Sequence, residues 1–470
     1  MFLCRENELL KLNRRYESKE AECVIVYGRR RVGKTALINE FVKDKPVIYF
    51  SALKAGAKDN LEALSKSVFT YKDPEVSETP FFHSFDAVFS EITRLAKGER
   101  LIFVIDEFPY LVYADESIPS RLQHLLDKEW KESSIFLILC GSSMSFMEKE
   151  VLSEKSPLFG RRTAQFRIQP LDYHDTAKFV PELSSSDKAL VYGITGGVPH
   201  YIKKLGVKTD IKDALLYNLF DTSSYLFEEP ENLLRQELRE PALYNSIITA
   251  VAGGASKLNE ISTKTGIDIP VCSKYLKTLS GLGIIKKTEP MLKNSQRKSF
   301  YRVSDMFFRF WYRFVPGNMS AITSGSMENV YDISIEAYLP EYMGYVFEKM
   351  CRQYLVYHAK NLPFNIGEIG EWWGGHPVSK KEIQLDILAT EAKGISSDTG
   401  RKFIVGSCKY KNEKIGKDEF ELIKDYASTF TNAHDDCYYY IFSKAGFKKN
   451  LIELSKEYKL KLISLEDMYS

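Results

Sequence analysis

Several features that would assign a chain to a membrane, a secreted scaffold or a zinc protein are missing from this sequence of 470 residues. No apolar run approaches the roughly 18 residues of a membrane span, and the first residues lack a signal-peptide pattern. The seven cysteines are scattered without a C-x-x-C pair, which argues against a zinc site or a disulfide scaffold and for reduced thiols. The sequence therefore predicts a soluble, cytoplasmic protein without a membrane partner.

A strong excess of charge is also missing. The formal net charge is +2 at pH 7, from 65 basic and 63 acidic residues, so the total favours no class of partner. No long-period repeat and no low-complexity tract is present. With 44% hydrophobic and 27% charged residues, the composition is that of a globular protein, and the length is sufficient for about three domains.

What the sequence does contain is a complete phosphate-binding pattern, G-x-x-x-x-G-K-[ST]. Its residues are Gly28, Arg29, Arg30, Arg31, Val32, Gly33, Lys34 and Thr35. The apolar spacing predicts a strand over 23–27 before this loop and a helix over 35–42 after it, as a P-loop requires. Glycines let backbone N–H groups face phosphate oxygens. Lys34 is expected to reach the β- and γ-phosphates of ATP, and Thr35 to hold Mg²⁺.

A second apolar strand, 101–105, ends in two acids, Asp106 and Glu107. A continuous apolar run is typical of a strand buried on both faces of a parallel sheet, and such sheets bind ligands at the carboxyl ends of their strands. Asp106 is expected to hold Mg²⁺, and Glu107 to polarise the attacking water. The pair predicts ATP hydrolysis as well as ATP binding.

Together with the segment from Phe2 to Leu10, which looks like F-x-R-E-x-E-L with one more residue before Arg5, these motifs resemble the archaeal-type P-loop ATPases, related to the STAND and AAA+ ATPases. The resemblance covers the whole chain. It implies that Ser142 or Ser143, after the apolar strand 135–140, senses the γ-phosphate; a helix cap is the alternative. The turn from Thr195 to Pro199 resembles the motif with which a helical lid touches the nucleotide.

The same resemblance implies an arginine finger at Arg161 or Arg162, because a guanidinium group stabilises charge on the γ-phosphoryl oxygens. A solvated basic loop or a salt bridge is the alternative. Whether such an arginine acts on its own nucleotide or on that of a neighbouring subunit stays open at this point.

Residues 241–303 show the pattern of a winged helix-turn-helix: three helices, a glycine turn and a strand pair. The cations expected to meet DNA phosphates lie on the third helix and the wing: Lys274, Lys277, Lys286, Lys287, Arg297 and Lys298. The alternative is a winged domain used for packing or for contact with a protein partner. The aromatic stretch 302–315 is expected to pack between domains, and residues 316–326 are expected to form a linker.

The last segment resembles the C-terminal domain of unknown function that accompanies these ATPases, which in turn is similar to the PD-(D/E)XK restriction-endonuclease fold. The positions that carry this likeness are Glu348, Asp386, Ser407 and Lys409. In active nucleases of this kind two acids bind Mg²⁺ and the lysine steadies the attacking water. Ser407 stands where a second acid is expected. We therefore expect weak Mg²⁺ binding and little or no DNA cleavage.

The fold expected is a multidomain α/β protein with four parts: a parallel-sheet P-loop ATPase core (1–170), a helical lid (171–240), a winged helix (241–316) and an α/β nuclease-like domain (327–470). The function expected is an ATP- and Mg²⁺-dependent switch that acts on DNA or a DNA-associated partner. The alternatives are a non-catalytic ATP-binding regulator or scaffold, and an active Mg²⁺-dependent DNA nuclease.

Overall fold

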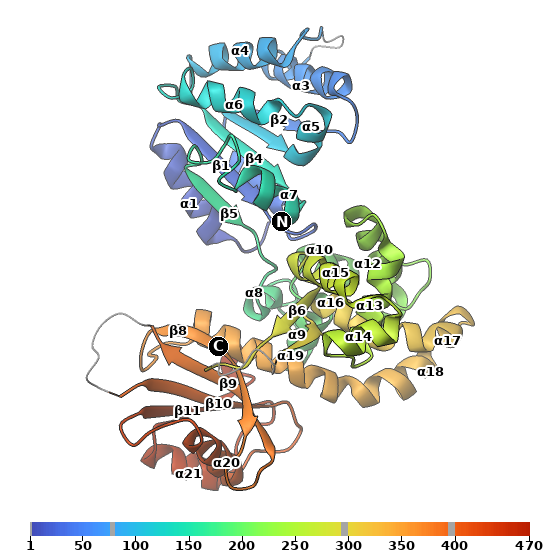
Figure 1. Cartoon of the computed structure of the whole chain (residues 1–470), viewed down its shortest axis with the longest axis vertical. Coiled ribbons are helices and arrows are strands. Elements are labelled where there is room, and N and C mark those ends of the chain that lie inside the picture. Colours follow the sequence, from blue (N-terminus) through green and yellow to red (C-terminus); the bar gives the residue numbers. More distant parts are fainter. Residues whose placement is uncertain (1, 76–79, 293–298, 393–399) are drawn as a thin grey trace. The chain divides into compact units, whose positions relative to one another are not determined.

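The computed structural model describes residues 2–75, 80–292, 299–392 and 400–470. The chain divides into two compact units (Figure 1). The first comprises Met1–Pro170 together with Val198–His200, and the second comprises Leu171–Gly197 and Tyr201–Ser470. No helix among the described residues is both long enough and apolar enough to cross a membrane.

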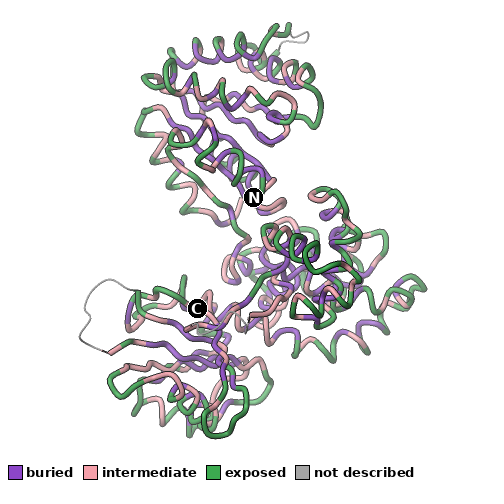
Figure 2. The backbone as a smooth tube through the Cα atoms, viewed as in Figure 1, coloured by how far each residue is buried: buried purple, intermediate pink, exposed green. Residues whose placement is uncertain are grey.

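The first unit is built on a five-stranded sheet in the order β2-β3-β4-β1-β5, in which every neighbouring pair is parallel. Its strands are β1 (Glu22–Tyr27), β2 (Val47–Ser51), β3 (Ile102–Asp106), β4 (Phe136–Gly141) and β5 (Ala164–Arg167). All residues of β1, β3 and β4 are buried, as their unbroken apolar runs predict (Figure 2). The prediction of a parallel-sheet P-loop ATPase core is confirmed.

Helices cover both faces of this sheet. The helical segments are α1 (Glu6–Glu17), α2 (Lys34–Val42), α3 (Ala57–Lys72), α4 (Phe85–Ala96), α5 (Phe108–Ala114), α6 (Ile118–Asp127), α7 (Met144–Phe146) and the π-helix η1 (Met147–Val151). Because side chains of a strand alternate between faces, Ile25 joins the core under α3 to α6, whereas Val24 and Val26 join the core under α1 and α2. The unit therefore has three layers, with the P-loop at the carboxyl end of β1.

The second unit begins with helices, as the apolar spacing of 171–238 predicts. They are α8 (Tyr173–Ala177), α9 (Ser185–Thr195), α10 (Pro199–Leu205), α11 (Ile211–Asn218) and α12 (Tyr225–Glu237). The next elements are α13 (Pro241–Ala252), α14 (Leu258–Thr265), α15 (Ile269–Gly281) and the antiparallel strands β6 (Ile285–Thr288) and β7 (Phe300–Val303). Three helices and a strand pair thus follow in the expected order. Most of the aromatic helix α16 (Met306–Phe314) is buried, as a packing role requires.

Residues 316–326 do not form the expected linker. They form the 3₁₀-helix η3 (Pro316–Asn318), the helix α17 (Met319–Thr323) and the turn that leads to α18 (Met327–Val330). The Asn318 side chain donates to the carbonyl of Phe314 at 2.8 Å, and Ile322 is buried. A segment rich in serine and glycine is expected to form a loop when none of its side chains is buried. Here the buried side chain of Ile322 holds the segment against the core.

The C-terminal part of the second unit is an α/β region. After η4 (Tyr331–Ile335), η5 (Glu336–Tyr338), α19 (Leu339–Gln353) and η6 (Tyr354–His358), five strands form a sheet in the order β12-β11-β10-β9-β8. These strands are β8 (Ile366–Gly375), β9 (Glu382–Glu391), β10 (Lys402–Lys409), β11 (Asp436–Ser443) and β12 (Leu460–Ser464). β8, β9 and β10 are antiparallel, whereas β10, β11 and β12 are parallel. The remaining helices are α20 (Lys417–Ser428), α21 (Lys449–Glu457) and η7 (Asp467–Tyr469).

Candidate functional site

The P-loop has a shape that its two glycines make possible. A Cβ atom on Gly28 would lie 2.3 Å from the carbonyl oxygen of Ile168, so no larger residue fits there. Gly33 has φ of +95° and directly precedes α2. Glycine adopts this left-handed conformation without a steric cost, which lets the backbone N–H groups before α2 turn toward a phosphate. The loop therefore fits the phosphates of a nucleotide.

Lys34 is buried inside this loop. Its Nζ atom donates to the carbonyl oxygens of Gly28 at 2.9 Å and Arg29 at 3.0 Å. Burial lowers the pKa of Lys34, because an ammonium group loses hydration there. Phosphate oxygens are stronger acceptors than these carbonyls, since they are charged. Lys34 is thus held where an anionic ligand of the loop would recruit it.

Asp106, at the end of β3, lies beside the first residues of α2. Its Oδ2 atom accepts hydrogen bonds from the Thr35 hydroxyl at 3.1 Å and from the Tyr49 hydroxyl at 2.8 Å. The backbone N–H of Glu107 donates to its Oδ1 atom at 2.9 Å. Thr35 and Asp106 are thus close enough to share one Mg²⁺ ion. Tyr49 was not foreseen from the sequence, because its partner follows 57 residues later in the chain.

Glu107 begins α5 in a left-handed conformation, with φ of +51°, which is uncommon for a glutamate. The Ser142 hydroxyl lies 3.0 Å and 2.9 Å from its two carboxylate oxygens. On the other side, the Nη1 atom of Arg30 lies 3.8 Å from Oε1, and Arg30 also donates to the Tyr110 hydroxyl at 2.9 Å. Ser142, rather than Ser143, is therefore the serine that faces Glu107.

Arg5 supports the outer side of the loop. It donates to the carbonyl oxygen of Val32 at 3.3 Å and also to that of Gln169. Val32 itself is fully buried, and Arg31 adopts a left-handed conformation with φ of +72°. The segment from Phe2 to Leu10 contributed to the family resemblance, but the residue that reaches the loop, Arg5, was not among the predicted site residues.

Pro199, which follows the glycine turn, lies near the P-loop. Pro199 belongs to the first unit with Val198 and His200, although both flanking segments belong to the second. A Cβ atom on Gly33 would lie 3.9 Å from Cγ of Pro199. At Gly197 a Cβ atom would lie 1.9 Å from the carbonyl oxygen of Leu171, so the turn needs glycine there. The motif therefore brings Pro199 to the edge of the candidate nucleotide site.

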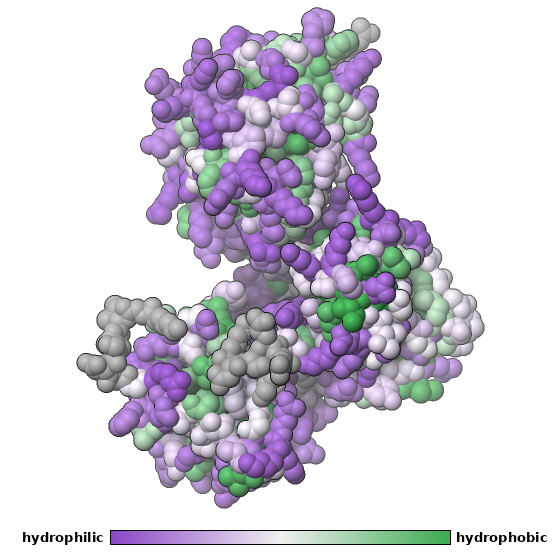
Figure 3. Space-filling view, in the orientation of Figure 1, coloured by the Kyte–Doolittle hydropathy of each residue, from purple (hydrophilic) through white to green (hydrophobic). Residues whose placement is uncertain are grey.

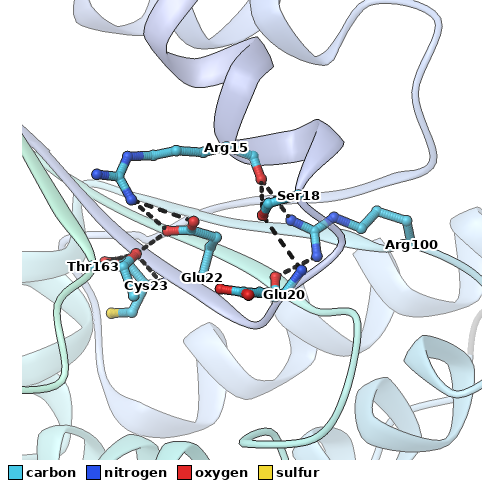
Figure 4. A network of polar contacts seen from close by, with 7 residues as sticks. All are labelled: Arg15, Ser18, Glu20, Glu22, Cys23, Arg100 and Thr163. Carbon is cyan, nitrogen blue, oxygen red and sulfur yellow. Dashed lines mark hydrogen bonds and ion pairs between the residues drawn. The ribbon is translucent and has the colours of Figure 1, made fainter.

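Arg161 and Arg162 lie at the opposite end of the sheet. Thr163 follows them and its N–H donates to the carbonyl of Cys23, near the start of β1. Figure 4 shows this end, where Arg15 and Thr163 both bind Glu22. From Cys23 to Gly28 the chain rises about 16 Å, at roughly 3.3 Å per residue.

Both arginines have partners at this end. Arg161 forms two hydrogen bonds of 2.9 Å with the carboxylate of Asp127, and Arg162 donates to the carbonyl of Leu152 at 2.9 Å. These contacts resemble the salt-bridge alternative. They also mean that neither guanidinium group lies beside the P-loop of its own domain.

The predicted DNA-binding lysines of α15, Lys274 and Lys277, are both exposed. Their helix also exposes Ile269 and Val271 at its start. Figure 3 shows apolar residues gathered over this helix. The surface is therefore mixed, with positive charge for an anionic partner and apolar area for a protein.

The strand pair carries Lys286 and Lys287 on opposite faces, and both side chains are exposed. Lys287 lies 3.6 Å from the carboxylate of Glu289. Arg297 and Lys298, which were also predicted to bind DNA, lie outside the described residues.

In the C-terminal region the structure brings Asp386, Ser407 and Lys409 together with a residue that sequence reasoning missed. Glu419 of α20 accepts a hydrogen bond from the Ser407 hydroxyl at 2.7 Å, and its Oε1 atom lies 3.2 Å from Nζ of Lys409. Asp386 accepts from the N–H of Cys408 at 2.8 Å. A carboxylate is thus present beside Ser407, although residue 407 does not supply it.

Glu348 of α19 completes the neighbourhood. Burial, with the Asp386 carboxylate nearby, raises the pKa of Glu348 to about 8, and burial also raises the pKa of Asp386. For Lys409 the effect of burial is outweighed by Glu419 and Asp386, which raise its pKa. Among the described residues, however, no three His, Cys, Asp or Glu side chains converge as in a preformed metal site.

The comparisons with known proteins agree with the ATPase-like fold of the first unit. Residues 2–205 match the model of an ATPase domain predominantly from Archaea, and residues 311–421 match that of archaeal and bacterial proteins of unknown function. The fold is similar to that of the Walker-type ATPase of Pyrococcus abyssi, with a TM-score of 0.50 and 18% identity over 66% of this chain and 96% of that one. At this identity the likeness concerns the fold alone.

Two relatives come from Methanocaldococcus jannaschii. An uncharacterized ATP-binding protein is 25% identical over 276 residues, 48% of this chain and 76% of its own. An uncharacterized protein is 32% identical over 418 residues, 88% of each chain. The chain therefore belongs to the family of proteins that carry an ATPase domain predominantly from Archaea, followed by a domain of archaeal and bacterial proteins of unknown function.

Proposed function

We propose that this protein binds ATP with Mg²⁺, hydrolyses it, and uses the cycle as a switch that acts on DNA or a DNA-associated partner. The observation that carries the ATPase part is the meeting of Thr35 with Asp106, beside a Glu107 carboxylate that Ser142 holds within hydrogen-bond distance. An adventitious glycine loop has no reason to place these groups together. When bound, Mg²⁺ neutralises charge on the phosphate oxygens.

The roles follow from the positions. Lys34 exchanges its two carbonyl partners for phosphate oxygens, and Thr35 with Asp106 holds the cation. Glu107 takes a proton from the attacking water once its carboxylate turns from Ser142 toward that water. Pro199 closes one edge of the site. The intact Glu107 argues against the rival interpretation, a regulator or scaffold that only binds ATP.

For the arginine finger we propose action in trans. Arg161 and Arg162 lie a full strand length from their own P-loop, so such a role requires the nucleotide of another subunit. The Asp127 carboxylate would then have to release Arg161. If no oligomer forms, the contact between Arg161 and Asp127 is a surface salt bridge.

We also propose that α13, α14, α15 and the strand pair form a winged helix. Lys274 and Lys277 are exposed on its third helix and support contact with DNA phosphates. The exposed Ile269 and Val271 support a DNA-associated protein as the alternative partner. Salt separates the two, since phosphate contacts weaken steeply with ionic strength.

For the C-terminal region we propose a nuclease-like domain that binds nucleic acid without cutting it. Asp386, Ser407 and Lys409 carry the likeness, and the absence of three converging acids among the described residues supports weak metal binding. Active Mg²⁺-dependent cleavage is a second candidate. One observation favours it: Glu419 brings a carboxylate to the position that Ser407 leaves without one.

A single-turnover measurement with labelled ATP tests the central proposal. The full chain is mixed with less than one equivalent of ATP and Mg²⁺, with and without duplex DNA. We expect ADP to form, and DNA to change its rate. Tight binding without ADP formation would instead establish the non-catalytic regulator, and a rate indifferent to DNA would leave an ATPase whose partner is a protein.

A further inference from the structure

The strand pair β6–β7 turns one face toward the helix α19 (Figure 1). Lys286 and Arg302 are direct partners across the pair, so their side chains lie on the same face. The Arg302 guanidinium lies 4.7 Å from the ring centre of Tyr345, which belongs to α19. Lys286 is therefore on the face that meets α19, and Lys287 is on the other face.

The matching face of α19 is charged. Tyr345, Glu348, Lys349 and Arg352 are spaced at i, i+3, i+4 and i+7 and so share one side of the helix. Glu371 of β8 connects the two elements, because it pairs with Arg302 at 2.5 Å and with Arg352 at 3.2 Å. We call the whole group the β7–α19 cluster: Lys286, Arg302, Lys349, Arg352, Glu348 and Glu371.

Positive charge exceeds negative charge in this cluster. Its two carboxylates are both engaged by arginines, Glu371 by two of them and Glu348 by Arg352 at 3.8 Å. Among the residues that the structure describes, no carboxylate lies within 4.0 Å of the ammonium group of Lys286 or Lys349. The recorded contact of Lys349 is the ring of Tyr192, 5.7 Å away. Within the described part of the chain, neither ammonium group is therefore paired with a carboxylate at ion-pair distance, although Glu371 partly offsets the lowering of the pKa of Lys286.

The surroundings of Lys286 and Lys349 disfavour the charged forms of both side chains. Burial lowers the pKa of Lys349, and burial followed by repulsion from Arg302 lowers the pKa of Lys286. Much of the Lys286 side chain is nevertheless exposed, so a ligand can reach it. Arg309, whose guanidinium lies 4.1 Å from the ring centre of Tyr345, adds further positive charge. Two cations that have no directly paired carboxylate and lie in partly desolvated positions favour the binding of an anion.

We infer that the β7–α19 cluster binds the phosphodiester backbone of DNA, with Lys286 and Lys349 as the two phosphate contacts. The inference rests on the proposed action on DNA, and it assigns to that function a site at the junction of the strand pair with the C-terminal region. Arg352 also donates to the backbone carbonyl of Asp386 at 2.9 Å. A strand held by the cluster therefore runs beside Asp386 and the residues around it.

The test measures binding of a fluorescent 20-base-pair duplex by the full chain over a range of salt concentrations. We expect Lys286→Gln with Lys349→Gln to weaken binding roughly 10- to 60-fold near 0.1 M salt. The slope of log K against log[salt] should fall by the contribution of about two phosphate contacts. The matched control, Lys424→Gln with Lys456→Gln, removes one exposed charge from α20 and one from α21. It should bind like the wild type.

The outcomes separate this inference from the function on which it rests. If the wild type binds and both double variants bind equally well, DNA binding stands and the cluster is not its site. If the control variant is weakened as much as the test variant, binding uses the surface without preference for this face. If the wild type shows no salt-dependent binding, the proposed action on DNA fails as well. If inorganic phosphate stabilises the protein but the duplex does not bind, the cluster is a small-anion site and the assignment is overturned.

Discussion

The nucleotide site and the C-terminal cluster around Asp386 both bring acids and a lysine to the ends of strands, but they assemble them differently. In the nucleotide site Lys34 and Thr35 are consecutive, and so are Asp106 and Glu107. In the C-terminal cluster Asp386 and Lys409 come from two strands, and the carboxylate beside Ser407 comes from the helix α20. A site made of contiguous residues can be recognised as a pattern, whereas one completed from a neighbouring helix cannot.

The two sites also differ in how their charges are held. Asp106 accepts hydrogen bonds from two hydroxyl groups and one backbone N–H. In the C-terminal cluster burial raises the pKa of both Glu348 and Asp386, and a neighbouring carboxylate adds to each effect: Asp386 for Glu348, and Glu419 for Asp386. The first site is therefore prepared for a cation, whereas the second resists holding all of its acids ionised without one.

The largest expected effect belongs to Lys34→Ala. It should abolish tight Mg-ATP binding and turnover, because it removes an ammonium group that is held inside the loop, at the carbonyl oxygens of Gly28 and Arg29. Calorimetry and a phosphate-release assay measure both. The control is Lys43→Ala, which removes an exposed lysine just after α2. Wild-type ATP affinity in Lys34→Ala would contradict the assignment of the loop.

Glu107→Gln should separate binding from hydrolysis. The amide keeps the size of the side chain and can still bond to Ser142, so ATP binding should persist. It cannot take a proton from water, and kcat should fall by the 10²–10⁴-fold that is typical of a lost general base. A normal rate would show that the two acids of β3 do not divide their roles as proposed, and the contrast with the C-terminal cluster would lose its basis.

The C-terminal cluster is tested by moving its carboxylate. In the full chain without nucleotide, Glu419→Gln should weaken Mg²⁺ binding at least about tenfold, because a hard cation depends on anionic oxygens. Ser407→Glu combined with Glu419→Gln should restore Mg²⁺ binding. The Ser407 hydroxyl lies 2.7 Å from the Glu419 carboxylate, so a carboxylate at position 407 can replace the one that is lost. Ser407→Glu alone would add a like charge beside Glu419.

The control for this exchange is Glu421→Gln, which removes an exposed acid of the same helix. Failure of the double variant to recover Mg²⁺ affinity would mean that Glu419 and Ser407 do not share one ligand position. Mg²⁺-dependent DNA cleavage by the wild type, lost in Glu419→Gln, would turn the second candidate function into the correct one.

The same distinction explains what the sequence could predict. The parallel sheet, the P-loop and the acids of β3 all follow from unbroken apolar runs and adjacent motif residues. Arg5, Tyr49 and Glu419 did not follow, because each meets its partner only through the fold. The prediction of a linker at 316–326 was wrong for a related reason. The polar residues of this segment are local signals, whereas the burial of Ile322 depends on tertiary packing. Local patterns do not report contacts between distant segments.

The smallest expected effect concerns Arg30, whose contact with Glu107 is longer than a hydrogen bond, at 3.8 Å, and partly exposed. Such pairs contribute about 0–1 kcal/mol, which corresponds to no more than about a fivefold change in rate. Because Glu107 would have to leave its contact with Arg30 before it takes a proton from water, Arg30→Ala should raise kcat by about two- to fivefold and leave KM unchanged. Arg30→Lys retains the charge and should stay close to the wild type. A fall in kcat of a hundredfold or more in Arg30→Ala would assign Arg30 a different role, as the cation that stabilises the γ-phosphoryl oxygens within its own domain. That outcome would also remove the need for Arg161 or Arg162 to act on another subunit.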